Sequence, residues 1–233
     1  MDDGPSPSAD SQATCWTVIR DAAAGRADAR RTFAGRYEPA IRAYLGARWR
    51  HSPLIREIDD AAQDVFLECF RADGALTRVD EERGGFRGFL YGVTRNVARR
   101  TEQATARNPR PSDSRIDLRA VEARDEDASR LFDQAWARAR IAEARALQVR
   151  RAAESGNGAL ERVEILRLRF ERGLPIREIA AHLGVDPART HHEYAKARRE
   201  FRQALIDVVR EQEDLSVAAA EAECLRLTRM LAS

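Results

Sequence analysis

Apolar side chains recur at steps of three and four residues along most of this chain, the spacing that gives an α-helix one buried face. Runs rich in Val, Ile and Thr that alternate with polar residues, as in strands, are nearly absent. Ala, Arg, Leu and Glu, which favour helix, are abundant. A length of 233 residues allows one or two domains. We therefore expect an all-α fold with two small helical domains joined by a flexible linker.

The N-terminal half predicts three amphipathic helices. The apolar positions of the first helix are Ala29, Phe33, Tyr37, Ile41, Tyr44, Leu45 and Trp49. Those of the second are Ile58, Ala62, Val65, Phe66 and Cys69, and those of the third are Phe86, Leu90, Val93 and Val97. Because each helix has one apolar face, the three helices should pack together as a bundle.

The segment from Pro175 to Phe201 carries the most specific local pattern. Ile176, Ile179, Ala180 and Leu183 outline a short amphipathic helix. Gly184 permits a left-handed turn, Asp186 is a good N-cap, and Pro187 is a good first residue of the next helix. Two helices joined by a short turn that contains glycine are typical of a helix-turn-helix.

The second helix of this motif has a polar outward face that could enter the major groove of DNA. Its candidate contacts to duplex DNA are Arg189, His191, His192, Glu193, Lys196 and Arg199. Arg and Lys can reach guanine edges, and Glu can accept a hydrogen bond from cytosine. The alternative is an ordinary helical hairpin with a basic, solvated face.

These patterns divide the chain into five expected segments. Pro109 and Pro111 lie in a polar stretch that is typical of a linker, and a further apolar stripe follows it. That stripe consists of Leu131, Phe132, Ala135, Trp136, Ala139, Ala142 and Ala146. The expected segments are a disordered tail at 1–13, a helical bundle at 14–100, a linker at 101–127, a helix-turn-helix domain at 128–206 and a C-terminal helical extension at 207–233. The extension has apolar positions at Leu215, Ala218, Ala222, Leu225, Thr228 and Leu231.

The third helix of the bundle has a basic stripe opposite its apolar face. The stripe contains Arg87, Tyr91, Arg95 and Arg99 at steps of four, with Asn96 beside it. Arginines that flank an aromatic ring suit single-stranded nucleic acid, because phosphates require positive charge and bases stack on rings. The alternative is a solvated basic helix face, and the residues alone do not decide between the two.

The second helix of the bundle is acidic on one face. Asp60, Asp64 and Glu68 are spaced by four residues, and Asp59, Gln63, Phe66 and Leu67 lie beside them. Such a face could dock on a protein with a basic surface. The alternative, a solvated run of charge, is the commoner case in general.

Charge and cysteine usage exclude several classes of protein. The net charge of +2 is low for a protein that binds DNA alone through many phosphates. Cys15, Cys69 and Cys224 form no CxxC pair, and the histidines are not at zinc spacing, so we expect neither a metal site nor a cofactor. Unpaired cysteines suit the cytoplasm. The sequence has neither a signal-peptide pattern nor an apolar run long enough to cross a membrane.

Taken together, these motifs resemble the sigma-70 family of RNA polymerase sigma factors, in its extracytoplasmic-function subgroup. The segment 59–67 resembles the polymerase-binding motif of the family, 86–96 its promoter-melting helix, and 176–205 its C-terminal helix-turn-helix. The opening at 132–136 resembles the start of the second domain in some subgroups. The motifs occur in the family's order, and the resemblance covers residues 15–100 and 128–206.

The resemblance implies a role for each segment. Core RNA polymerase would be bound through Asp59, Asp60, Gln63, Asp64 and Phe66. The minus-ten promoter element would be captured and melted by Arg87, Tyr91, Arg95, Asn96 and Arg99, with the loop at 74–85. The minus-thirty-five element would be read by the helix-turn-helix, and an anti-sigma factor or another regulator is a further candidate partner. Such a protein is not an enzyme.

The recognition helix departs from the family pattern. Where the family usually has Gly-Thr-Val-Lys-Ser-Arg-Leu, residues 188–194 read Ala-Arg-Thr-His-His-Glu-Tyr, so no promoter sequence can be carried over. The extension at 207–233 exceeds the minimal family length and could pack on its own chain or bind a regulator.

Two other functions remain open. One is a helix-turn-helix regulator that binds duplex DNA without polymerase. The other is a helical nuclease, which would need convergent carboxylates or a histidine base that the sequence does not offer.

Overall fold

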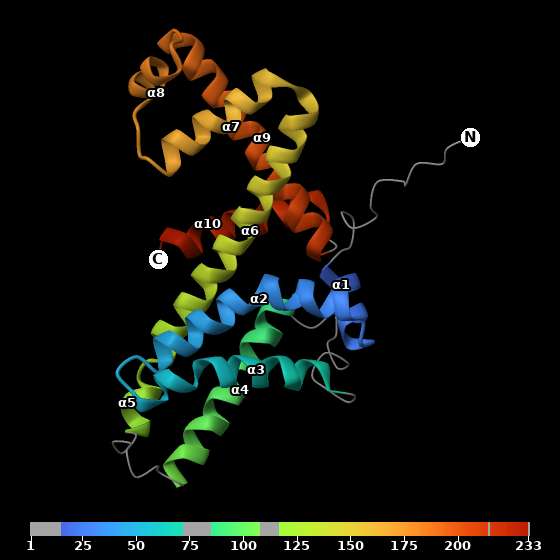
Figure 1. Cartoon of the computed structure of the whole chain (residues 1–233), viewed down its shortest axis with the longest axis vertical. Helices are drawn as coiled ribbons and strands as arrows, with labels where there is room; N and C mark the ends of the chain where they lie inside the picture. Colours follow the sequence, from blue (N-terminus) through green and yellow to red (C-terminus); the bar gives the residue numbers. More distant parts are fainter. Residues whose placement is uncertain (1–14, 72–84, 108–116, 214, 233) are drawn as a thin grey trace, which may run out of the picture. The chain divides into compact units, whose positions relative to one another are not determined.

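The computed structural model describes residues 15–71, 85–107, 117–213 and 215–232, and within them every regular element is a helix (Figure 1). The expected all-α class is therefore confirmed. The first elements are α1 (Cys15–Ala23), α2 (Ala27–Arg48), the short 3₁₀ helix η2 (Pro53–Glu57), α3 (Ile58–Phe70), α4 (Gly85–Arg107) and α5 (Leu118–Glu122). They are followed by α6 (Asp125–Ser155), α7 (Asn157–Phe170), α8 (Ile176–Leu183), α9 (Pro187–Glu213) and α10 (Val217–Ala232). The predicted tail at 1–13 lies outside the described residues, as does the predicted loop at 74–85 except for Gly85, which begins α4.

The described chain divides into two compact units. The first comprises α1 to α5 and α6 as far as Ala139, with the ends of α9 and α10. The second comprises α6 from Arg140, α7, α8, most of α9 and the start of α10.

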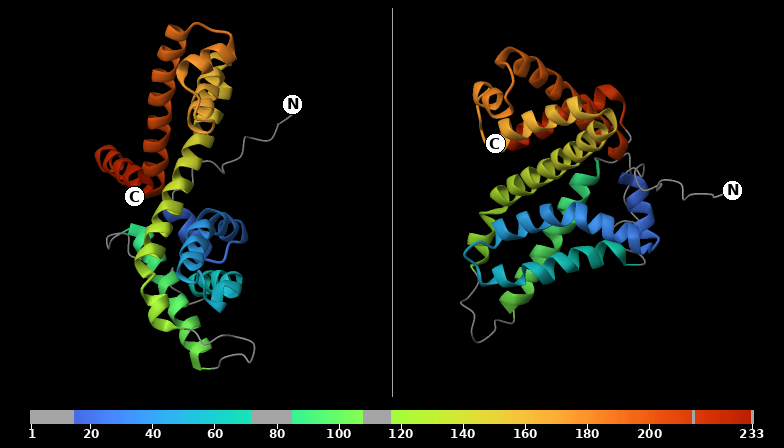
Figure 2. Two further views of the ribbon diagram at one scale, coloured as in Figure 1. Left: turned by 90° about the vertical axis from the view of Figure 1, so that its left-hand side faces the viewer. Right: turned by 45° about the horizontal axis from the view of Figure 1, so that its top comes forward.

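The core of the first unit forms where α2, α3 and α4 meet, as Figures 1 and 2 show. The predicted apolar faces of these helices are the ones that the structure buries, and the rings of Phe33, Tyr37 and Phe86 pack within 6 Å of one another, centroid to centroid. Full burial of such a side chain contributes about 1.5–3 kcal/mol. Helices α2, α3 and α4 were therefore predicted correctly from their spacing, whereas α1, which packs on α2, was not predicted.

The predicted linker at 101–127 differs from the structure at both ends. Helix α4 continues to Arg107, and Glu102 within it is buried. Near the other end, Asp117 caps α5 by accepting hydrogen bonds from the backbone N–H groups of Arg119 and Ala120 at 3.1 and 3.2 Å. Residues 108–116, with both linker prolines, lie outside the described residues.

The start of the predicted second domain packs in the first unit instead. Residues 128–139 belong to that unit, where Trp136 stacks on Tyr37 at 5.3 Å and Phe132 packs edge-on against Tyr91 at 5.6 Å. The predicted apolar stripe of α6 is only partly right, because Ala142 and Ala146 are exposed. The buried positions recur every four residues and include polar side chains: Ala128, Phe132, Trp136, Arg140, Ala144, Gln148 and Ala152.

The second unit has a small core built by α7, α8 and α9. Ile165 and Leu168 of α7 pack with Ile179 of α8, and Tyr194 of α9 lies against them. Gly156, with a φ of 94°, separates α6 from α7.

Helix α10 is a helix, as expected within the predicted extension at 207–233, but residues 207–213 continue α9 and the buried face of α10 is not the predicted one. The structure buries Ala220, Cys224 and Leu227, whereas Ala218, Ala222, Leu225 and Thr228 are exposed. A shift of two residues turns a helix by about 200°, so the opposite side is covered. Both faces carry a mixture of small and large apolar side chains, so spacing did not distinguish them.

Candidate functional site

The acidic face of α3 is open to solvent. Asp60, Gln63 and Asp64 are all exposed, and Leu67, one turn further along, has 59% of its surface exposed. Residues spaced by three and four share one side of a helix, so these four form a single surface, the α3 face. Asp59 lies at its edge and forms an ion pair with Arg42 of α2.

Phe66 is only half-exposed, unlike its polar neighbours. Its ring stacks on Phe70 at 6.1 Å and meets the edge of Phe33 at 6.2 Å. One side of the ring therefore completes the core of the first unit, and only the remainder borders the α3 face.

Three residues of the basic stripe on α4 are engaged by α6. Arg87 forms an ion pair with Asp133, Tyr91 packs against Phe132, and Arg95 contacts Asp125 at 2.7 Å. The side chain of Arg87 has 25% of its surface exposed and that of Arg95 has 37%. The stripe is thus a packed face over its first two turns.

The far end of the stripe remains accessible. Asn96 and Arg99 are exposed and, with Arg100 and Gln103, line an open cavity of about 450 Å³ beside Glu68 of α3. Arg100 contacts the Glu68 carboxylate at 3.1 Å. The lining therefore combines arginine and amide groups, which suit a phosphate and a base edge, with one carboxylate that is paired with Arg100.

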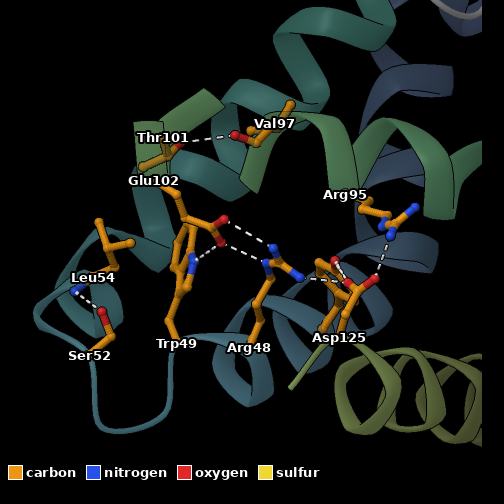
Figure 3. Close-up of polar contacts among 10 residues, drawn as sticks. Arg48, Trp49, Ser52, Leu54, Arg95, Val97, Thr101, Glu102 and Asp125 are labelled. Carbon is orange, nitrogen blue, oxygen red and sulfur yellow. Dashed lines mark hydrogen bonds and ion pairs between the residues drawn. The ribbon is translucent and has the colours of Figure 1, made fainter. Parts of the chain in front are cut away.

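A buried polar network lies beside this stripe (Figure 3). Arg48 is fully buried and donates two hydrogen bonds to Glu102, at 2.6 and 3.0 Å, and a third to Asp125 at 2.6 Å. The indole N–H of Trp49 donates to Glu102 at 2.9 Å, and the hydroxyl of Tyr44 donates to Asp125 at 2.6 Å. The network ties the end of α2 to α4 and to the first turn of α6.

The charges of this network set its protonation. Burial disfavours the ionised form of Asp125, but the hydrogen bond from Tyr44 and the charges of Arg48 and Arg95 outweigh burial and lower its pKa. Burial and the hydrogen bond to Asp125 raise the pKa of Tyr44. Burial opposes the charge of Arg48, yet the hydrogen bond to Glu102 and nearby anionic groups raise its pKa overall. Arg48 and Asp125 are therefore charged at neutral pH.

The helix-turn-helix geometry follows the local signals in the sequence. Gly184 ends α8 in the left-handed region with a φ of 66°, and the N–H of Val185 donates to the carbonyl of Ala180 at 3.0 Å. Asp186 then caps α9, because its side chain accepts a hydrogen bond from the N–H of Arg189 at 3.0 Å. The turn and the cap direct the start of α9 away from α8.

The predicted DNA-contacting residues of α9 fall into two groups. His191, His192 and Arg199 are exposed, as is Arg189, which contacts Glu161 at 3.5 Å. Glu193 and Lys196 are half-buried instead.

Glu193 is held by two cations. Its carboxylate contacts Arg162 of α7 at 3.2 Å and Lys196 at 3.1 Å, and the hydrogen bonds from Lys196 and Arg162 lower its pKa. Arg162 also contacts Glu200 at 2.8 Å. Glu193 therefore braces α9 against α7.

The roles of four residues that matter to these surfaces were missed in the sequence. They are Glu102, Asp125 and Asp133, and also Phe132, which was predicted as part of an apolar stripe but not as a partner of Tyr91. One signal was present: Leu90, Thr94, Ala98 and Glu102 are spaced by four residues and all are buried. An acidic residue in register with an apolar stripe indicates a buried ion pair.

Comparisons with known proteins returned no family: no family model matches the chain, and no curated protein matches it significantly. Across the described ranges, no group of three or more His, Cys, Asp or Glu side chains could hold a metal ion. No helix in the same residues is long and apolar enough to cross a membrane.

Proposed function

We propose that this protein is a sigma factor of the extracytoplasmic-function subgroup, which binds core RNA polymerase, recognises the minus-thirty-five and minus-ten promoter elements and promotes DNA melting. The observation that carries the proposal is the combination of surfaces in one chain. A helix-turn-helix with an exposed basic helix accompanies a helical unit with an acidic face on α3 and an arginine-rich helix α4. The resemblance of the three motifs to that family supports the same reading.

Duplex recognition would fall to the exposed residues of α9. Arg189, His191 and His192 lie in the first turns after the cap, the part of a recognition helix that reaches base edges. Arg199, three turns from the start, suits a phosphate. Because Glu193 is paired with Arg162 and Lys196, its proposed role is to set the orientation of the helix.

Polymerase docking would use the α3 face. Three exposed polar residues around an exposed leucine give a surface with both charge and apolar area, which is typical of a protein interface. Such a face is expected of a subunit that docks on polymerase, and a regulator that acts through duplex DNA alone does not require it, which favours the sigma-factor proposal.

Strand capture would begin at the accessible end of α4. Asn96 and Arg99 offer a base-edge partner and a phosphate partner beside the open cavity. The net charge of +2 agrees with a subunit that polymerase brings to DNA, because weak intrinsic affinity keeps the unbound factor off promoters.

The decisive experiment is transcription by purified core polymerase on a genomic fragment library, with and without this protein. The proposal expects new start sites only when the protein is present. Asp60→Arg should abolish both association with core and transcription. Asp28→Arg, the same charge change at an exposed position of α2, should leave them unchanged.

The rival function makes the opposite prediction. A regulator that acts without polymerase would retard specific duplex fragments in a gel shift by itself and would not associate with core. That pair of results would replace the sigma-factor proposal with a helix-turn-helix regulator.

A further inference from the structure

The first half of α6 covers α4 with a set of groups that resembles nucleic acid. Asp125 and Asp133 place carboxylates on Arg95 and Arg87, and Phe132 places a ring against Tyr91. Both views of Figure 2 show this part of α6 beside the helices of the first unit. Each of the three stripe residues therefore has one partner from a nine-residue segment.

The chemistry of these partners is the chemistry of a single strand. A strand would bring anionic phosphates to the two arginines and a flat base to the tyrosine. The carboxylates and the phenyl ring satisfy the same groups in the same order along α4. A strand and α6 cannot occupy these groups together.

We infer that residues 125–136 of α6 are an intramolecular cover that competes with single-stranded DNA for α4, so that strand capture requires the cover to detach. The inference rests on the proposed function, since it regulates the surface proposed there to hold the strand. The exposed Asn96 and Arg99 lie outside the cover and give an incoming strand its first contacts.

Phe132 and Trp136 of the cover are buried in the first unit, so the covered state predominates in the free protein, whereas the ion pairs at its rim are weak. Its two ion pairs are partly exposed, a class of contact that is individually weak in proteins. Asp125 is the firmer attachment, because it also accepts hydrogen bonds from Arg48 and Tyr44. The equilibrium between covered and open states reduces the apparent affinity for DNA by the fraction of molecules that are open.

The test measures binding of a fluorescent single-stranded oligonucleotide to the full chain at low salt. Asp133→Asn should tighten binding about threefold, and the double variant with Asp125→Asn roughly tenfold, because each change weakens the cover and alters no residue of α4. Asp127→Asn is the matched control. It lies on α6 with 66% of its side chain exposed, paired with Arg130 of the same helix, and should bind as the wild type does.

Amide hydrogen exchange is a second measurement. If residues 125–136 were only a structural part of the first unit, their exchange rates would not change when the oligonucleotide binds. Binding of the oligonucleotide should speed amide exchange over 125–136, because those residues leave α4. Continued protection of this segment at saturating oligonucleotide would overturn the inference.

The outcomes separate the cover from the proposed function. If Arg99→Ala weakens binding but the two Asp→Asn changes have no effect, the strand is held as proposed and the cover does not exist. If neither the wild type nor the double variant binds the oligonucleotide, the inferred cover is again rejected. The sigma-factor proposal is then tested separately by transcription with core polymerase. If Arg99→Ala has no effect in any form, α4 is not the strand-binding surface and both proposals fall.

Discussion

The carboxylate of Glu102 is the acceptor at the centre of the buried network, and its removal is the sharpest test of how the first unit is held together. Its side chain is 4% exposed and Arg48 is fully buried, so water cannot replace the lost partner. Removing one partner of a buried ion pair lowers the free energy of unfolding by about 3–5 kcal/mol. Glu102→Gln keeps one oxygen acceptor, and Asp125 still contacts Arg48, so we expect the lower end, about 3 kcal/mol.

That loss is large beside a total stability of about 5–15 kcal/mol for a typical protein. Urea unfolding, followed by circular dichroism and tryptophan fluorescence, should show a midpoint lower by about 1–2 M. Trp49 donates to Glu102 and contributes a local signal. The neighbouring Gln103→Ala, at an exposed position, should change stability by no more than about 0.5 kcal/mol.

A double replacement tests the cause of the loss. Arg48→Met with Glu102→Leu removes both charges together and should recover much of the stability, since apolar pairs often replace buried ion pairs without loss. If Glu102→Gln unfolds within about 0.5 kcal/mol of Gln103→Ala, the network does not hold α2 to α4, and the physical account of the first unit is wrong.

Three further predictions follow from the local geometry. Because the pKa of Asp125 is lowered in the fold, its charged form stabilises the protein at pH values above the unfolded pKa of about 3.9, and this stabilisation is lost as the pH falls below that value. The difference in urea midpoint between wild type and Asp125→Asn should therefore shrink from pH 7 to pH 3.5. An unchanged difference would show that Asp125 is not ionised in the folded protein. Gly184→Ala should destabilise the second unit by about 1 kcal/mol in thermal unfolding because of its positive φ, whereas Gly35→Ala inside α2 should stabilise the first; equal effects would refute the turn geometry. Arg199→Ala should weaken duplex binding to all sequences alike and reduce its salt slope by about 1, whereas Arg189→Ala should alter base preference in a selection experiment; the reverse pattern would reassign the two arginines.

Much of the candidate site could be predicted from sequence because its signals are local. The acidic positions of the α3 face follow from helical spacing alone, and the structure leaves Asp60, Gln63 and Asp64 exposed. The covering of the stripe on α4 could not be predicted. Arg87 and its partner are 46 residues apart in the sequence, and Tyr91 and Arg95 are 30 or more residues from theirs. The spacing of residues within one helix carries no information about such distant partners.

The sequence by itself determined the helices and the helix-turn-helix, because each depends on contacts between residues a few positions apart. Gly184 permits the left-handed turn and Asp186 caps α9 whatever else the chain does. The tertiary structure alone decided which partners the buried polar residues have. Glu102 and Asp125 both fall in the predicted linker at 101–127, and only the fold places Arg48, 54 and 77 residues away, between them. A buried charge is tolerated only beside its partner, and that partner is supplied by packing between helices, which local spacing does not encode.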